Sequence, residues 1–237
     1  MQLIGHRGYP ARYPENTIES FIHALKAGCV GIELDVRLTQ CGELVVIHDA
    51  TLDRTTNITG NVSDYNANEL AEHNVPTLWN VLATLKDSDI LVFIEAKEPT
   101  IGTSIANVIE DAQKQLGYDV QQLIVISFAK KVLADVQKHN AYIPLGVSLC
   151  SPELGYKADS YGFKNKQDMA SIKQAIATYK PLYLVPNIHE VTAEMAALAK
   201  QHAIEIAAWT IHNAKDAAFA QQLPINYAIT NDPMLHS

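Results

Sequence analysis

The chain has 237 residues, of which 48% are hydrophobic and 19% are charged, and its formal net charge is −8. This length suits one large barrel or two small domains. A protein that grips the phosphates of nucleic acid needs a dense stripe of lysine and arginine. The sequence has no such stripe, so we do not expect nucleic acid as a partner.

The composition also bears on the compartment. No apolar run approaches the roughly 18 residues of a membrane helix. Arg7 interrupts the short apolar stretch near the N-terminus, which therefore does not resemble a signal peptide. Three cysteines lie far apart in the sequence, and an odd, scattered set suits a reducing compartment. We expect a cytoplasmic protein that does not insert into a membrane.

Short β-branched runs alternate with helical patterns along the chain. Helical segments such as 17–28, 104–117 and 194–203 separate most of the strand candidates. We expect Asn16 to cap the first helix, with Glu19 completing a capping box three residues later. The strand candidates are residues 2–6, 31–36, 44–48, 90–96, 123–127, 143–149, 182–186, 204–210 and 227–230.

Alternating strands and helices predict a parallel sheet covered by helices. The candidate at 44–48 follows its neighbour across only QCGE, which is too short for a helical crossover, so it should form a hairpin. The other eight strands fit the usual ~250 residues of a (β/α)₈ TIM barrel. We therefore expect one α/β barrel domain over residues 1–237, with a small insertion at about 49–76. The alternative is an open doubly wound sheet, which calls for a Gly-rich phosphate loop that GHRG does not provide.

Chemically active side chains gather where the expected strands end. Residues two apart in a strand share a face, so Glu33 and Asp35 should point the same way, as should Glu95 and Lys97. In a barrel, catalytic residues sit at the carboxyl ends of the strands. The residues at these ends are His6, Arg7, Glu33, Asp35, His48, Glu95, Lys97 and Trp209.

Each of these residues has an ordinary explanation when taken alone, as an ion pair or a core aromatic. Three carboxylates at one mouth are costly to bury unless they are paired or bind a metal. The three carboxylates carry a charge of −3, and Arg7 and Lys97 contribute +2, so the net charge of the site is −1. One divalent cation would make the site +1 and complementary to a phosphodiester. Oxygen ligands favour Mg²⁺ or Ca²⁺, which leaves His6 and His48 free for proton transfer.

Several motifs together resemble one known family. They are GHRG (5–8), PENT (14–17), GIELDVRLT (31–39), VIHDATLDRTTNITG (46–60), VPTL (75–78), IEAK (94–97), WTIHN (209–213) and AITNDP (228–233). They occur in the order and spacing of the glycerophosphodiester phosphodiesterases, and the resemblance covers essentially the whole chain. Departures from the family pattern at WTIHN and at VPTLWN leave His212 and Trp79 without a role.

The resemblance implies a (β/α)₈ barrel that hydrolyses glycerophosphodiesters to sn-glycerol 3-phosphate and an alcohol. It implies Glu33, Asp35 and Glu95 as ligands of one divalent cation, Mg²⁺ or Ca²⁺. His6 and His48 would serve as general acid and base, and the nucleophile would be water or the substrate's own 2-hydroxyl. Arg7 and Lys97 would contact the phosphate, and Trp209 would line the glycerol side of the site. Glu15 and Asn16 would not contact the substrate but would hold the residues that do.

Other readings stay open at this stage. A phospholipase-D-like enzyme with a similar barrel would act on lysophospholipids. A helical metal phosphohydrolase would use His48 and Asp49 as paired ligands, although here they end an apolar strand. A catalytically inactive binding barrel should have lost a histidine or a carboxylate, and this chain has all of them. The oligomeric state, monomer or homodimer, is left open.

The expected substrate is a small, water-soluble diester. The segment 51–76 has one aromatic residue, Tyr65, and its apolar residues are scattered among polar ones. An enzyme that draws lipid from a membrane presents an apolar or basic surface instead. Against this expectation, three aromatic residues in the segment 150–165 offer a possible apolar lip: Tyr156, Tyr161 and Phe163.

Overall fold

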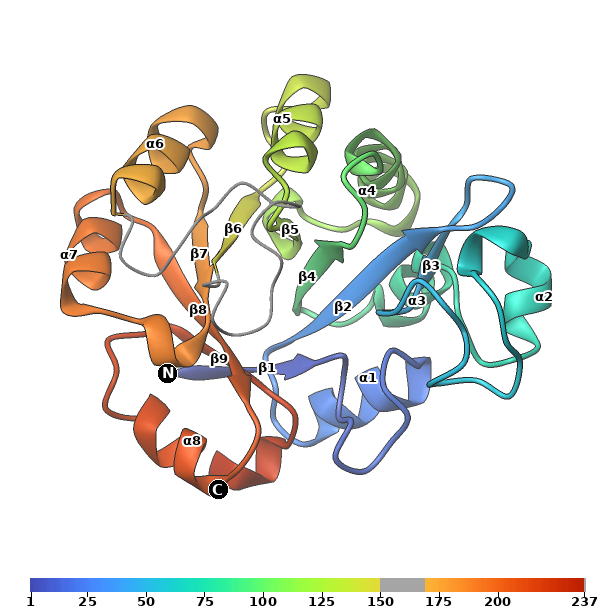
Figure 1. Ribbon diagram of the computed structural model, residues 1–237, viewed down its shortest axis with the longest axis horizontal. Coiled ribbons are helices and arrows are strands. Elements are labelled where there is room, and N and C mark those ends of the chain that lie inside the picture. Colours follow the sequence, from blue (N-terminus) through green and yellow to red (C-terminus); the bar gives the residue numbers. More distant parts are fainter. Residues whose placement is uncertain (150–168, 237) are drawn as a thin grey trace.

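The protein is known from a computed structural model, which describes residues 1–149 and 169–236 (Figure 1). Within these residues, eight parallel strands close into a barrel, because β1 pairs with both β2 and β9. The predicted TIM barrel is thus confirmed. The strands of the barrel are β1 (Gln2–His6), β2 (Gly31–Leu38), β4 (Leu91–Ala96), β5 (Leu123–Ser127), β6 (Leu145–Leu149), β7 (Tyr183–Pro186), β8 (Glu205–Ile211) and β9 (Tyr227–Thr230).

Helices cover the outside of the barrel, as Figure 1 shows. Apolar residues recur along them at helical spacing, and these residues form the buried layer between helices and sheet. The helices that connect the barrel strands are α1 (Ile18–Lys26), α3 (Leu78–Leu85), α4 (Gly102–Leu116), α5 (Lys130–His139), α6 (Met169–Tyr179), α7 (Ala193–Gln201) and α8 (Ala214–Ala220).

Alternation along the strands sorts side chains into two layers. Ile32, Leu34 and Ile94 face the helices. Phe93 packs inside the barrel, with its ring centroid 5.0 Å from that of Tyr183. The interior therefore has a filled aromatic and aliphatic base, and the polar residues of the same strands lie toward the carboxyl ends.

The predicted hairpin is present but shorter than expected. β3 (Leu44–Val46) pairs antiparallel with the end of β2 and stops two residues before His48. Beyond Val46, the Ile47 N–H still donates to the Asp35 carbonyl at 2.9 Å. At the next residue, the Arg37 side chain donates from Nε to the His48 carbonyl at 2.8 Å. A side chain thus holds the backbone at His48, where the pairing with β2 ends.

The segment that follows β3 forms a small unit with its own core. It contains the short helix α2 (Ala67–Ala71), capped by Asn66 and Glu69, which form a capping box. Val62 and Leu70 pack with Ile47 in a separate apolar cluster. This cluster attaches the segment to β3 and holds it at the edge of the barrel.

The predicted cap of the first helix is wrong. Thr17 caps α1 and its side chain accepts from the Ser20 backbone N–H at 3.2 Å. Asn16 has φ +58° and its side chain reaches Asp35 instead. Because its amide bonds to Asp35 on β2, Asn16 does not serve the helix, and Glu19 forms no capping box with it.

In the parts of the chain that the structure describes, no helix combines the length and apolar character that crossing a bilayer requires. The expected aromatic lip at 150–165 lies outside the described residues. Trp79 packs against the layer between helices and sheet, which gives it a structural place.

Candidate active site

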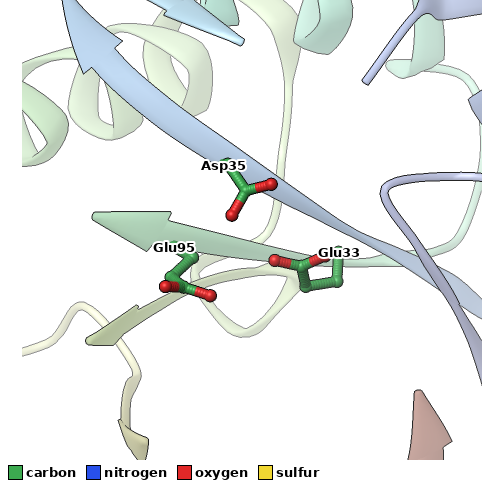
Figure 2. Close-up of side chains that lie close together, drawn as sticks. All are labelled: Glu33, Asp35 and Glu95. Carbon is green, nitrogen blue, oxygen red and sulfur yellow. The ribbon is translucent and has the colours of Figure 1, made fainter. Parts of the chain in front are cut away.

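Three carboxylates meet at the carboxyl end of the barrel. Glu33 and Asp35 come from β2, and Glu95 comes from β4, where it lies beside Asp35 in the sheet register. One oxygen from each lies within 4.8 Å of the others. Figure 2 shows the three carboxyl groups turned toward one another. The alternation of β2 thus places its two acids on the interior face, as the sequence predicted.

Burial and neighbouring charges shift the pKa values of Glu33 and Asp35 in opposite directions. The pKa of Glu33 is raised well above its ordinary value by burial and by the nearby charges of Asp35 and Glu95. Burial also acts to raise the pKa of Asp35, but Lys97 and Arg7 outweigh it and the result is a lowered pKa. Without further positive charge, the cluster cannot hold three full negative charges cheaply.

The cluster fits a hard divalent cation. Glu33 Oε1 and Asp35 Oδ1 are buried and accept no hydrogen bond from the described part of the chain. Lys97 Nζ lies 3.4 Å from Asp35 Oδ1, which is an ion pair. Buried oxygens that lack donors are costly, and an all-oxygen ligand set suits Mg²⁺ or Ca²⁺.

Two cations flank the carboxylates. Lys97 Nζ lies 2.7 Å from Glu95 Oε1. Arg7 Nε lies 3.1 Å from Asp35 Oδ2, and its Nη1 donates to Glu15 Oε1 at 2.9 Å. Both cations thus lie against the carboxylates at the mouth of the barrel.

A tight turn after β1 presents His6 and Arg7. Arg7 has φ +53° and Gly8 has φ +90°, and the Arg7 backbone N–H donates to Glu33 Oε2 at 3.1 Å. A Cβ at Gly8 would lie 2.8 Å from the Ser20 Cβ on α1. The glycine of GHRG therefore lets the turn approach the helix closely.

His6 is held on one side of its ring. Its Nδ1 lies 2.6 Å from Asn231 Oδ1, and Nε2 lies 3.9 Å from Glu33 Oε2. Burial and the nearby Arg7 charge lower the pKa of His6 to about 3. The imidazole is therefore neutral near pH 7.

His48 is held by a chain of charged groups. Its Nδ1 lies 2.6 Å from Asp49 Oδ1. Arg54 Nε donates to Asp49 Oδ2 at 2.6 Å, and its two terminal nitrogens donate to Glu15. The Arg54 hydrogen bond lowers the pKa of Asp49 to about 2. The pKa of His48 is lowered by burial, against the charge of Asp35.

A cavity of about 190 Å³ opens at the mouth of the barrel. One wall carries Trp209, whose Nε1 donates to the Val185 carbonyl at 2.8 Å and whose ring meets Phe128 edge-on at 5.7 Å. The expected site residues among its lining are His6, Arg7, Glu33, Glu95 and Trp209.

His48 lines a different cavity, of about 660 Å³, between the start of α1 and the segment after β3. Asp35 and Lys97 contact residues that line the first cavity. Asp35 forms an ion pair with Arg7, and Lys97 forms one with Glu95. The structure therefore places every expected site residue at this end of the barrel, but His48 and Trp209 line different cavities.

Sequence reasoning gave no role to Arg54, Asn231 or His212, and it considered Asp49 only as a metal ligand in the rival phosphohydrolase reading. Asp49 and Arg54 lie within the stretch 46–60 that carries the family resemblance, so their motif was a usable signal. Asn231 is 225 residues from His6. It lies in AITNDP (228–233), one of the stretches that carry the family resemblance, but that motif does not indicate a contact with His6.

Comparison with known proteins settles the family. Residues 6–235 match the model of the glycerophosphoryl diester phosphodiesterase family. The chain belongs to this family. The predicted enzyme class, a phosphoric diester hydrolase, is confirmed by this membership.

Similar members and structures extend over the whole chain. A glycerophosphodiester phosphodiesterase of Caldanaerobacter subterraneus is 31% identical and aligns over 98% of this chain and 94% of its own. The crystal structure of the glycerophosphodiester phosphodiesterase of Thermotoga maritima is 27% identical, covers 98% of this chain and 95% of its own, and has a TM-score of 0.78.

An Oleispira antarctica phosphodiesterase, solved with the product sn-glycerol-3-phosphate, superposes with a TM-score of 0.82. It is 19% identical, and the match covers 100% of this chain and 95% of that one. At this identity the likeness supports the fold alone.

Proposed function

We propose that this protein hydrolyses glycerophosphodiesters to sn-glycerol 3-phosphate and an alcohol with the help of one divalent cation. The observation that carries the proposal is the buried cluster of Glu33, Asp35 and Glu95, flanked by two cations at the barrel mouth. Membership of the family supports the reaction class. These three acids would bind Mg²⁺ or Ca²⁺, and neither histidine would be a ligand of the ion.

The charges of the site match the substrate. The three acids and the two cations leave −1, and a divalent cation makes the site +1, opposite to a phosphodiester. When bound, such a cation would polarise a phosphoryl oxygen and offset the charge that develops on it. Arg7 and Lys97 would shift part of their bonding from the carboxylates to the phosphate oxygens, where a guanidinium fork fits well.

The two histidines would transfer the protons. In each ring Nδ1 meets a partner, Asn231 for His6 and Asp49 for His48, which leaves Nε2 for the substrate. One histidine would take the proton of the nucleophile while the other protonates the leaving oxygen. The nucleophile would be water or the substrate's 2-hydroxyl, and both fit the same pair of histidines.

The remaining assignments follow from contacts. Trp209, with Phe128 against it, would cover the carbon face of the glycerol. Asn16 Nδ2 donates to Asp35 Oδ2 at 2.9 Å, and Glu15 accepts from Arg7, so both would orient groups that act on the phosphate.

The substrates would be small and soluble, and the protein would work in the cytoplasm as one barrel domain. The larger cavity beside His48 is lined by polar side chains such as Thr55 and Asn57 and also by apolar ones such as Ile18 and Val75. The preference for a soluble substrate therefore rests on the polar sequence of the segment 51–76 and on the net charge of −8.

The deciding experiment measures kcat/KM for glycerophosphocholine and for lysophosphatidylcholine in Mg²⁺ and in Ca²⁺. The readout is release of choline, which both substrates yield, together with glycerol 3-phosphate from the first and lysophosphatidic acid from the second. We expect the soluble diester to be hydrolysed and strongly preferred. A preference for the lysolipid would replace this proposal with the phospholipase-D-like reading. No hydrolysis of any glycerophosphodiester would refute the proposed reaction.

A further inference from the structure

Asn231 lies between two imidazole rings at the mouth of the barrel. Its Oδ1 lies 2.6 Å from His6 Nδ1, and its Nδ2 lies 2.9 Å from His212 Nδ1. We propose that Asn231 is a positioning residue that fixes the ring orientation and the tautomer of His6. This inference rests on the proposed role of His6 in proton transfer and adds the group that prepares it.

The hydrogen-bond chemistry of the amide sets the direction of the chain. An amide oxygen accepts and an amide nitrogen donates. His6 therefore carries its ring proton on Nδ1, which donates to Asn231. Its Nε2 then has a free lone pair on the side of the ring that faces the carboxylate cluster, where a substrate proton would be taken.

The same amide also orients His212. Because Asn231 Nδ2 donates to His212 Nδ1, the ring proton of His212 is on Nε2. His212 lines the mouth cavity, so this Nε2–H is available to an oxygen of the bound substrate. The Asn231 amide thus makes Nε2 of His6 a hydrogen-bond acceptor and Nε2 of His212 a hydrogen-bond donor.

The backbone around Asn231 holds the amide in place. Its N–H donates to the Ile211 carbonyl at 3.0 Å, and its carbonyl accepts from the Ala11 N–H at 3.2 Å. These bonds tie the residue to the end of β8 and to the loop that follows β1. The amide is therefore preorganised between the rings, as catalytic geometry requires, and a side-chain substitution leaves these bonds intact.

The tautomer is measured directly by long-range ¹H–¹⁵N spectra of the histidine rings in the Mg²⁺-loaded protein near pH 7.5. The His6 signal is assigned by its loss in His6→Gln. We expect the Nδ1–H tautomer in the native protein and a loss of that preference in Asn231→Ala. An Nε2–H tautomer in the native protein would overturn the inference. This readout does not depend on the substrate, so it stands even if the proposed reaction fails.

Kinetics provide the second test. Asn231→Ala should lower kcat by roughly 10–100-fold, as for removal of a group that holds a catalytic or ligating histidine. KM should change by less than about threefold, because the amide itself is not assigned to hold substrate. Asn231→Asp keeps an acceptor for His6 Nδ1 and should recover part of the lost kcat.

The matched control is Asn226→Ala. Asn226 Oδ1 accepts from the Ile206 N–H at 2.9 Å, at the amino end of β9 and away from the mouth. It should lose stability without losing kcat. Equal losses of kcat in the two alanine variants, or native kcat in Asn231→Ala, would refute the positioning role. If Asn231→Ala does not fold, Asn231→Asp and the native spectrum decide.

Discussion

Arg54 donates two hydrogen bonds to the carboxylate of Glu15, at 2.7 and 2.8 Å. Glu15 belongs to the loop after β1 and also accepts from Arg7, while Arg54 belongs to the segment after β3 and also donates to Asp49. The Arg54–Glu15 pair therefore connects the segment that carries His6 and Arg7 to the segment that carries His48.

Loss of this connection should affect activity more than stability. Arg54→Gln releases Asp49, and with it the His48 ring, so we expect kcat/KM to fall roughly 10-fold or more. The Arg54 side chain is 48% exposed, so the free energy of unfolding should fall by no more than about 1 kcal/mol. Kinetics and urea unfolding measure the two effects. Lys131→Gln breaks another exposed ion pair, with Asp135, and is the control that should leave kcat/KM unchanged.

The acid dependence of stability should report on Asp49. Its pKa is about 2 in the folded protein, below its ordinary value of 3.8, so its ion pair stabilises the fold above about pH 4 and is lost as the pH falls toward 2. Asp49→Asn should therefore be less stable than the native protein by up to about 1 kcal/mol near pH 5, and the gap should close with acid. Urea unfolding at several pH values measures it.

The Arg54 hydrogen bond is the main cause of that lowered pKa. In an Arg54→Gln background, Asp49→Asn should have little pH-dependent effect. A gap of the same size in both backgrounds would show that another group is responsible.

Removal of either proton-transfer group should lower turnover. We expect His6→Ala and His48→Ala each to reduce kcat by roughly 10²–10⁴-fold, with smaller changes in KM. Arg7→Ala should lower kcat/KM as well, because the substrate phosphate would lose the hydrogen bonds that the guanidinium group would donate. His202→Ala, at the end of α7, is the control. Near-native turnover in either of the first two variants would end the two-histidine mechanism.

Removal of divalent cations should abolish activity. Exhaustive treatment with EDTA should stop hydrolysis, and Mg²⁺ or Ca²⁺ should restore it, since the three acids would hold the ion. The same ion should raise the Tm of the treated protein, because a ligand that binds the folded state stabilises it. Glu33→Gln should weaken this rise, whereas Glu205→Gln, at the amino end of β8, should retain it. Full activity after chelation would contradict the metal site.

The tight turn after β1 should depend on Gly8. Gly8 and Gly28 both have positive φ, +90° and +95°, but a Cβ at Gly28 meets nothing within 4 Å, whereas one at Gly8 meets Ser20. Gly28→Ala should cost about 1 kcal/mol from backbone strain. Gly8→Ala should cost a further ~1–3 kcal/mol from overpacking. Equal losses in urea unfolding would mean that α1 moves aside freely.

The barrel and its acidic cluster could be predicted because they follow from short-range patterns. The period of two along β2 fixes the common face of Glu33 and Asp35, and the four-residue link QCGE fixes the hairpin. Strand ends in a barrel converge on one mouth, which brings Glu95 to the same place without any long-range information.

The errors and omissions come from tertiary contacts. Asparagine is a common helix-capping residue, but the Asn16 amide donates to the buried carboxylate of Asp35 on β2, and Thr17 caps the helix instead. Likewise, His6 and His48 could be identified as candidate catalytic residues, but not what holds them. Asn231 meets His6 only because β9 closes the barrel beside β1.

The pairing of β1 with β9 also orders events during synthesis. One partner of β1 is made more than 200 residues after it, so the barrel stays open while the residues between the two strands are synthesised. The partner of His6 arrives with that same last strand. A chain that stops before residue 227 would lack both closure and a fixed His6. We expect such a fragment to be an unfinished sheet with exposed edges, recognised by chaperones and proteases, and not an unregulated hydrolase.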